Sequence, residues 1–201
     1  MIKIAVLVSG GGTNLQALID AWKEGLFPGA ELSLVISSAA GVYAIERAQK
    51  ACIKSITIER KKHSNISDFD DAILSALSEH NIDLVVLAGF LTILGPQVLK
   101  SYKDRIINVH PALIPSFSGK GFYGIHVHRA VIEYGVKITG ATVHFVNEIV
   151  DGGKIILQKA VDVLPDDTPQ TLQQRVMQEG EWVILPQAVA MFCRGELDNI
   201  E

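Results

Sequence analysis

The chain has 201 residues, 48% of them hydrophobic, so it is long enough to bury a core without disulfides or structural metals. It carries 18 lysines and arginines against 22 aspartates and glutamates, and the resulting charge of −4 argues against a nucleic-acid-binding surface. The apolar N-terminal run is too short for a signal segment and no stretch approaches the length of a bilayer span, so we expect a cytoplasmic protein without a membrane partner.

The two cysteines, Cys52 and Cys193, lie far apart in helix-like contexts. This spacing matches neither a disulfide framework nor a metal site, so we expect two buried thiols in a reducing cytoplasm. A chain of this length is expected to form one domain, over residues 1–201.

Short apolar runs alternate with helical patterns along the first half of the chain, a rhythm typical of βαβ units around a parallel sheet. Strands are expected at 2–8, 32–37, 54–58 and 83–88, and helices at 14–23, 43–51 and 67–80. The first strand is almost entirely apolar, as expected of a strand covered on both faces. The sequence therefore predicts an α/β fold with a Rossmann-like, open, mostly parallel sheet and helices on both faces.

The rhythm changes after residue 89. A short helix is expected at 96–102, a strand at 105–110, a helix at 125–134, and strands at 138–146 and 155–163. Because an Asp-Gly-Gly turn lies between the last two strands, we expect them to pair antiparallel. In the final helix Thr168 can cap the N-terminus and Pro169 can occupy the first position; the helix should run through Trp182 towards Phe192 with a bend near Pro186.

The segment 115–124 contains three glycines and three aromatic residues, which suits a loop that lies close to another group. A plain surface connection is the alternative. A cis bond at Ile114-Pro115, at the start of this loop, is left open.

Two polar side chains end the strand at 105–110. Pro111 cannot donate a ladder hydrogen bond, so the strand should end at His110, with Asn108 two residues earlier on the same side. Ligands bind at the carboxyl ends of strands in open α/β sheets, and an amide beside an imidazole can stabilise a developing oxyanion and manage protons. The alternative is that Asn108 caps a turn and His110 is a structural histidine.

A glycine-rich turn, residues 9–14, lies between the first strand and the first helix. Its backbone amides and the helix N-terminus together form an arrangement that binds phosphate. A dinucleotide site would need a glycine at Leu15 and an acidic residue near Ser37, and a nucleotide P-loop would need a lysine followed by serine or threonine. We therefore expect a site for one phosphate of a smaller ligand, with a simple tight turn as the alternative.

Further candidates are an aspartate and three histidines. Asp151 precedes two glycines at a turn where its carboxylate could face His110 and favour the charged form of the ring. His126, His128 and His144 show no zinc-binding spacing, so we expect supporting or structural roles for them and no metal site.

These features occur together in one family. The chain resembles the folate-dependent glycinamide ribonucleotide (phosphoribosylglycinamide) formyltransferases of purine biosynthesis over nearly its whole length. The motifs that carry the resemblance are 9–15 (SGGGTNL), 87–91 (LAGFL), 108–115 (NVHPALIP), 126–129 (HVHR), 142–146 (TVHFV) and 151–153 (DGG).

The resemblance implies roles for individual residues. Asn108, His110 and Asp151 match the catalytic residues of the family. The nucleotide substrate is implied to meet Gly11, Gly12, Thr13, Asn14, Pro111 and Glu181. The folate is implied to meet Phe90, Leu91, Thr92, Ile93, Leu94, Asn108, Val146 and Val150. Ser9 and His126 are expected to support these sites. Residues 1–100 would form the half that binds the nucleotide phosphate, and 101–201 the folate and catalytic half.

Two departures from the family pattern concern the folate. Leu91-Thr92 and Ile66 stand where many members carry arginines, so the contacts with the folate tail are left open.

The implied reaction transfers the formyl group of 10-formyltetrahydrofolate, the cosubstrate, to the amine of glycinamide ribonucleotide by direct attack through a tetrahedral intermediate. Asn108 and charged His110 would donate to the oxyanion, and Asp151 would sustain that charge and move a proton through water. Neither a covalent enzyme intermediate nor a metal is implied. Formyltetrahydrofolate hydrolases and methionyl-tRNA formyltransferases share the Asn-x-His and Asp pattern but lack the glycine-rich loop. A noncatalytic nucleotide-binding module and a homodimer also stay open.

Overall fold

The computed structural model describes residues 1–197 and contains one seven-stranded sheet. Its strands are hydrogen-bonded in the order β3-β2-β1-β4-β5-β6-β7. The chain divides into two compact units, and the second begins at Asn108, within β5 (Ile106–His110). The predicted α/β fold, a mostly parallel sheet with an antiparallel pair towards the C-terminus, is confirmed.

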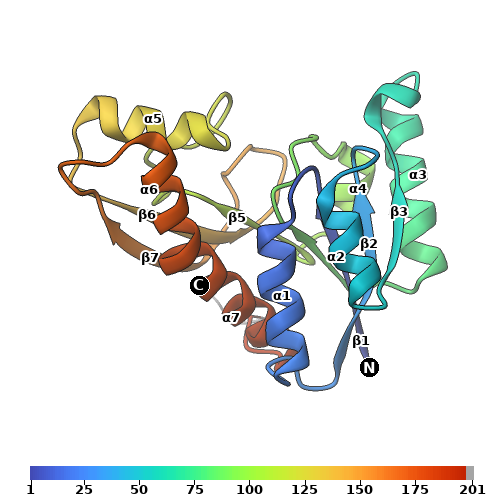
Figure 1. The fold of residues 1–201 in the computed structure, drawn as a ribbon. Coiled ribbons are helices and arrows are strands. Elements are labelled where there is room, and N and C mark those ends of the chain that lie inside the picture. The colour runs from blue at the N-terminus through green and yellow to red at the C-terminus, as the bar shows by residue number, and fades with distance from the viewer. Residues whose placement is uncertain (198–201) are drawn as a thin grey trace. The chain divides into compact units, whose positions relative to one another are not determined.

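The first unit is a series of βαβ crossovers (Figure 1). Its parallel strands are β1 (Ile2–Val8), β2 (Ala30–Ser37), β3 (Lys54–Thr57) and β4 (Leu84–Leu87). Its helices are α1 (Thr13–Lys23), α2 (Tyr43–Lys50), η1 (Arg60–Lys62), α3 (Ile66–Glu79) and α4 (Pro96–Ser101). Because β2 and β4 flank β1 on opposite sides, right-handed crossovers place α1 and α2 on one face of the sheet and α3 on the other.

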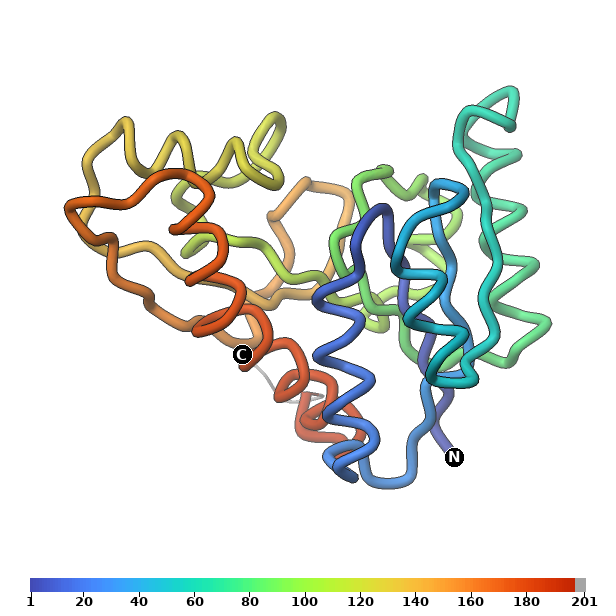
Figure 2. The backbone as a smooth tube through the Cα atoms, viewed as in Figure 1, coloured from blue at the N-terminus to red at the C-terminus, as the bar shows by residue number. Residues whose placement is uncertain are grey.

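The second unit contains the antiparallel pair and the last helices. Its elements after β5 are α5 (Ile125–Tyr134), β6 (Ile138–Phe145), β7 (Ile155–Asp162), α6 (Pro169–Arg175), the π-helical η2 (Val176–Glu181) and α7 (Trp182–Cys193). Helix α5 packs against α6, whereas η2 and α7 pack against β6 and β7. The tube in Figure 2 shows α6, η2 and α7 following one another directly.

The expected elements lie within two residues of the observed bounds, except in the final helix. Thr168 caps α6 as predicted, since its Oγ1 accepts from the N–H of Thr171 at 3.2 Å. Pro186 lies inside α7, and the segment before α7 is the π-helical η2. The bend expected near Pro186 stays a prediction. Pro186 has no N–H to donate to the carbonyl of Trp182, four residues earlier. The helical hydrogen bond that is missing because of Pro186 therefore lies at the start of α7.

The expectation of two buried thiols is wrong. Cys52 is exposed and Cys193 is partly exposed, and both are free. Helix α2 ends at Lys50, so Cys52 lies in the turn before β3, with a φ of 57°. Within residues 1–197, no helix has both the length and the apolar character needed to cross a membrane.

Candidate active site

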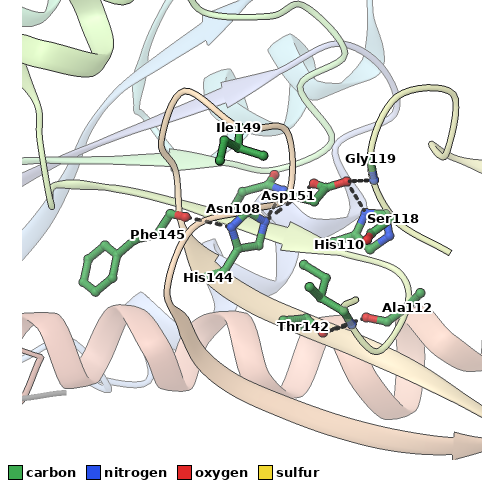
Figure 3. A network of polar contacts seen from close by, with 12 residues as sticks. Asn108, His110, Ala112, Ser118, Gly119, Thr142, His144, Phe145, Ile149 and Asp151 are labelled. Atoms are coloured by element: carbon green, nitrogen blue, oxygen red, sulfur yellow. Dashed lines mark hydrogen bonds and ion pairs between the residues drawn. The ribbon is translucent and has the colours of Figure 1, made fainter. Parts of the chain in front are cut away.

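The second unit brings Asn108, His110 and Asp151 together (Figure 3). Alternation along β5 places Asn108 and His110 on one face of the strand. The Nδ1 atom of His110 lies 3.5 Å from Oδ2 of Asp151. Asp151 itself has a φ of 55°, an uncommon conformation for a residue with a side chain. The three residues that the sequence analysis selected therefore form one cluster.

His144 on β6 orients Asn108. Its Nδ1 lies 2.7 Å from the carbonyl oxygen of Phe145, so we assign the ring proton to Nδ1. Its Nε2 then accepts from Nδ2 of Asn108 at 3.2 Å, whereas Oδ1 of Asp151 is farther away, at 3.7 Å. One N–H of the Asn108 amide is used in this contact, and the second is left to donate to a ligand.

The Asp151 carboxylate is held by several donors. Burial alone would raise its pKa, but the N–H of Gly119 and the positive charge of protonated His110 act against burial, and the pKa lies below the ordinary value of 3.8. The N–H of Gly119 donates to Oδ2 at 2.8 Å. Asp151 is therefore ionised at neutral pH and can accept a proton.

His110 is almost completely buried, and both of its ring nitrogens face oxygen atoms. Nε2 lies 2.8 Å from the carbonyl oxygen of Phe117, and Nδ1 faces Asp151. Burial lowers the pKa of His110 below 6.5, although Asp151 and the Phe117 carbonyl act to raise it. The predicted support of the charged form by Asp151 is present, but burial outweighs it. The shorter contact, at Nε2, fixes that proton, so Nδ1 is the nitrogen that titrates beside Asp151.

Two other histidines of this unit lie on α5, and the supporting role expected of His126 stays a prediction. His126 is exposed, and its ring packs on Tyr123 with centroids 5.1 Å apart. His128 is fully buried, and burial together with the charge of His110 lowers its pKa from 6.5 to about 4. Their spacing on α5 could have shown that the two rings point in different directions, but not which of them faces the core.

Hydrogen bonds from Thr142 hold the turn that follows β5. The Thr142 hydroxyl donates to the carbonyl of Ala112 at 2.7 Å and accepts from the N–H of Ile114 at 3.1 Å. The Nε2 amide of Gln158 on β7 donates to Thr142 Oγ1 and to the carbonyl of Ile114, each at 3.0 Å. These bonds fix the segment that contains Pro111 and the cis Ile114-Pro115 bond.

Other candidates in this unit lie at its loops and at η2. Glu181, at the end of η2, is 7% exposed. Val146 is partly buried and Val150 is 49% exposed, on the loop that leads to Asp151. Gly153 must be a glycine, because a Cβ there would collide with the carbonyl oxygen of Phe145. The Asp-Gly-Gly sequence thus closes the loop tightly next to the carboxylate.

The glycine-rich turn belongs to the first unit and precedes α1. Gly12 caps this helix with a φ of 71°, and a Cβ at Gly12 would lie 2.7 Å from the Cβ of Ala44. Arg47 donates to the carbonyl of Gly11 at 2.9 Å and to Gln16 at 2.8 Å. The turn that begins α1, including Thr13 and Asn14, is therefore held rigidly by α2. Its shape suits an anion at the helix N-terminus.

Ser9 links this turn to the segment 90–94 within the same unit. Its Oγ accepts from the N–H of Leu91 at 2.8 Å and lies 2.6 Å from Oγ of Ser38. Leu91 and Ile93 are 63% and 72% exposed, so this segment offers an apolar edge. Phe90 and Thr92 are partly buried and Leu94 is 5% exposed.

Sequence reasoning missed Asp70, which anchors the end of this segment. Asp70 has no exposed surface and accepts from the N–H groups of Gly95, Gln97 and Val98 at 2.8, 3.1 and 3.5 Å. No motif singles it out, because an aspartate in an amphipathic helix usually faces solvent.

The expectation of no metal stays a prediction. Within residues 1–197, no group of three or more His, Cys, Asp or Glu side chains is arranged to hold a metal ion.

Comparison with known proteins identifies relatives along the whole chain. The model of the formyl transferase family matches residues 2–189. The phosphoribosylglycinamide formyltransferase of Haemophilus influenzae is 42% identical over 203 residues, which cover 100% of this chain and 92% of that protein. The trifunctional purine biosynthetic protein adenosine-3 of Gallus gallus is 42% identical over 194 residues, 96% of this chain, but the chain spans only 19% of its length.

Solved structures show the same similarity. The crystal structure of glycinamide ribonucleotide transformylase 1 from Symbiobacterium toebii matches with a TM-score of 0.93 and 41% identity, covering 100% of this chain and 91% of that one. The phosphoribosylglycinamide formyltransferase from Bacillus halodurans matches with a TM-score of 0.88 and 33% identity, covering 99% and 97%.

Proposed function

This chain belongs to the formyl transferase family, as a relative of the phosphoribosylglycinamide formyltransferases, and we propose that it carries out their reaction. The formyl group of 10-formyltetrahydrofolate passes to the amine of glycinamide ribonucleotide, giving formylglycinamide ribonucleotide and tetrahydrofolate in purine biosynthesis. The observation that supports this most directly is the cluster in which ionised Asp151 lies next to His110 and His144, which in turn orients Asn108.

The chemistry follows from the donors and the acceptor in this cluster. The substrate amine attacks the formyl carbon, a C–N bond forms, and the electron pair of the carbonyl bond moves to oxygen. The free N–H of Asn108 donates to this oxyanion, and His110 adds a second donor when Nδ1 is protonated, a form that Asp151 favours and burial opposes. The 3.5 Å separation between Nδ1 and Asp151 is long enough for the proton to be shared with a substrate oxygen.

Collapse of the intermediate needs one proton transfer. The attacking nitrogen becomes cationic and loses a proton to Asp151, directly or through water. The same proton then passes to N10 of the folate as the C–N10 bond breaks. Asp151 is suited to this step because its lowered pKa keeps it ionised before the attack.

The two substrates meet different parts of the chain in this proposal. The glycine-rich turn at Gly11, Gly12, Thr13 and Asn14 binds the phosphate through backbone N–H groups and the helix dipole. Pro111 and Glu181 contact the rest of the nucleotide. The apolar edge at 90–94, with Val146 and Val150, receives the folate ring. A folate-type cosubstrate without a metal, and a reaction in the cytoplasm, complete the proposal.

The test is the absorbance change when 10-formyldideazafolate and glycinamide ribonucleotide are mixed with the native protein. We expect turnover by the native protein, and a loss of about a thousandfold in kcat for Asp151→Asn and of about a hundredfold or more for His110→Ala. Glu148→Gln, an exposed change on the same loop, is the matched control and should leave kcat unchanged. Failure of the folded native protein to turn over would remove the proposal.

A further inference from the structure

The loop 115–124 holds two members of the cluster through its main chain. The Phe117 carbonyl accepts from Nε2 of His110 at 2.8 Å. The Gly119 N–H donates to Oδ2 of Asp151, also at 2.8 Å (Figure 3). The carbonyl is an acceptor for the ring N–H of His110, and the N–H is a donor for the carboxylate of Asp151. The loop therefore sets which nitrogen of His110 faces Asp151.

Phe117 reaches this position in a strained conformation. Its φ is 49°, in the left-handed region, which costs about 1 kcal/mol or more for a residue with a side chain. Such a conformation persists only when the surroundings hold it. The Gly119–Asp151 bond and the bond from Ser118 Oγ to the carbonyl of Pro115 hold the loop, and the contacts of the Phe117 ring add to them.

Two aromatic rings hold the Phe117 ring. Phe122, on the same loop, packs edge-to-face against it, with centroids 6.3 Å apart and an interplanar angle of 72°. Tyr134, the last residue of α5, packs in the same way at 5.9 Å and 82°. Helix α5 is anchored by buried residues such as Val127 and Val131, so Tyr134 is the fixed end of this contact.

We propose that Tyr134 is a positioning residue for the reaction, because its ring holds Phe117 and thereby keeps the Phe117 carbonyl on His110. Tyr134 is 80% exposed, so packing in the core does not account for an aromatic residue at this position. Its action on the rate rests on the proposed function, but its action on His110 does not. The effect passes from Tyr134 through the Phe117 backbone to one ring nitrogen, and it leaves substrate binding unchanged.

The experiment compares Tyr134→Ala with Tyr134→Phe, which keeps the ring, and with Tyr123→Ala, an exposed ring that packs on His126 instead. The first readout is the Nε2–H signal of His110 in a ¹H–¹⁵N spectrum of the histidine rings. The second is kcat against KM with both substrates. Thermal unfolding of each variant shows whether the fold is retained.

We expect Tyr134→Ala to weaken the His110 signal and to lower kcat about fivefold, because the loss of one aromatic pair corresponds to a change of about that factor in rate. KM should stay within about twofold of the native value. Tyr134→Phe should behave like the native protein, as should Tyr123→Ala. The double variant Phe122→Ala/Tyr134→Ala removes both ring contacts and should lower kcat about 25-fold.

An unchanged His110 signal in the double variant would overturn the proposal, as would an equal effect of Tyr123→Ala. A lower kcat without a change in the signal would show a merely structural role. If the native protein has no formyltransferase activity, the spectrum still decides whether Tyr134 controls His110.

Discussion

His128 should make the protein sensitive to mild acid. Its pKa in the folded protein is about 4, against 6.5 without the effects of burial and of His110. Between these two values the unfolded chain binds a proton that the folded protein does not, so stability falls as pH falls. At pH 5.0 the difference amounts to about 2 kcal/mol relative to neutral pH, and it approaches about 3 kcal/mol near pH 4.

The assay is urea unfolding at pH 7.5 and pH 5.0, comparing the native protein with His128→Phe. The phenylalanine ring has a similar shape and does not titrate, so the variant should lose about 2 kcal/mol less stability between the two pH values. His126→Phe, two residues away on the exposed side of α5, is the control and should keep the native pH dependence. The reasoning is refuted if His128→Phe and the native protein lose the same stability on acidification.

Two further changes test the first unit. Gly12→Ala should destabilise the fold by about 3 kcal/mol, because the φ of Gly12 is 71° and the added Cβ would meet Ala44 at 2.7 Å. Chemical unfolding measures this loss of stability, and a loss below about 1 kcal/mol would contradict the prediction. Asp70→Asn replaces an acceptor oxygen with a donor facing backbone N–H groups, so we expect a loss of about 2 kcal/mol and a higher KM for the folate. Asp71→Asn, an exposed neighbour on α3, is the control, and equal effects of the two changes would exclude the anchoring role.

Most of the fold could be predicted from hydrophobic periodicity. The run from Ile4 to Val8 has no exposed surface, as its continuous apolar character indicated. The interruption of the last helix at η2 was not predictable, because the sequence Val176–Glu181 carries no proline or β-branched run that would signal it. The exposure of Cys52 was missed for a related reason. A boundary error of one residue moves a side chain from a helix to a turn.

In the candidate site, the relative positions of Asn108 and His110 could be predicted from the local sequence, but their hydrogen-bond partners could not. The alternation of Asn108 and His110 on β5 follows from strand geometry alone. The partners of these residues come from distant positions, such as His144 for Asn108 and Phe117 for His110. The second of these is a backbone carbonyl, and a carbonyl has no sequence signature. Residues that act through their main chain are therefore invisible to motif reasoning, even when they contact the chemistry directly.

Two residues that contact His110 have a left-handed backbone conformation. Phe117 and Asp151 both have positive φ values, 49° and 55°, and both contact the same imidazole. Glycine would adopt either conformation without strain, at about 1 kcal/mol less per position. At position 151 it would remove the carboxylate, and at position 117 it would remove the ring that Tyr134 holds. Each position needs a left-handed backbone and a side chain together, so the strain is a consequence of the site and not a defect of the fold.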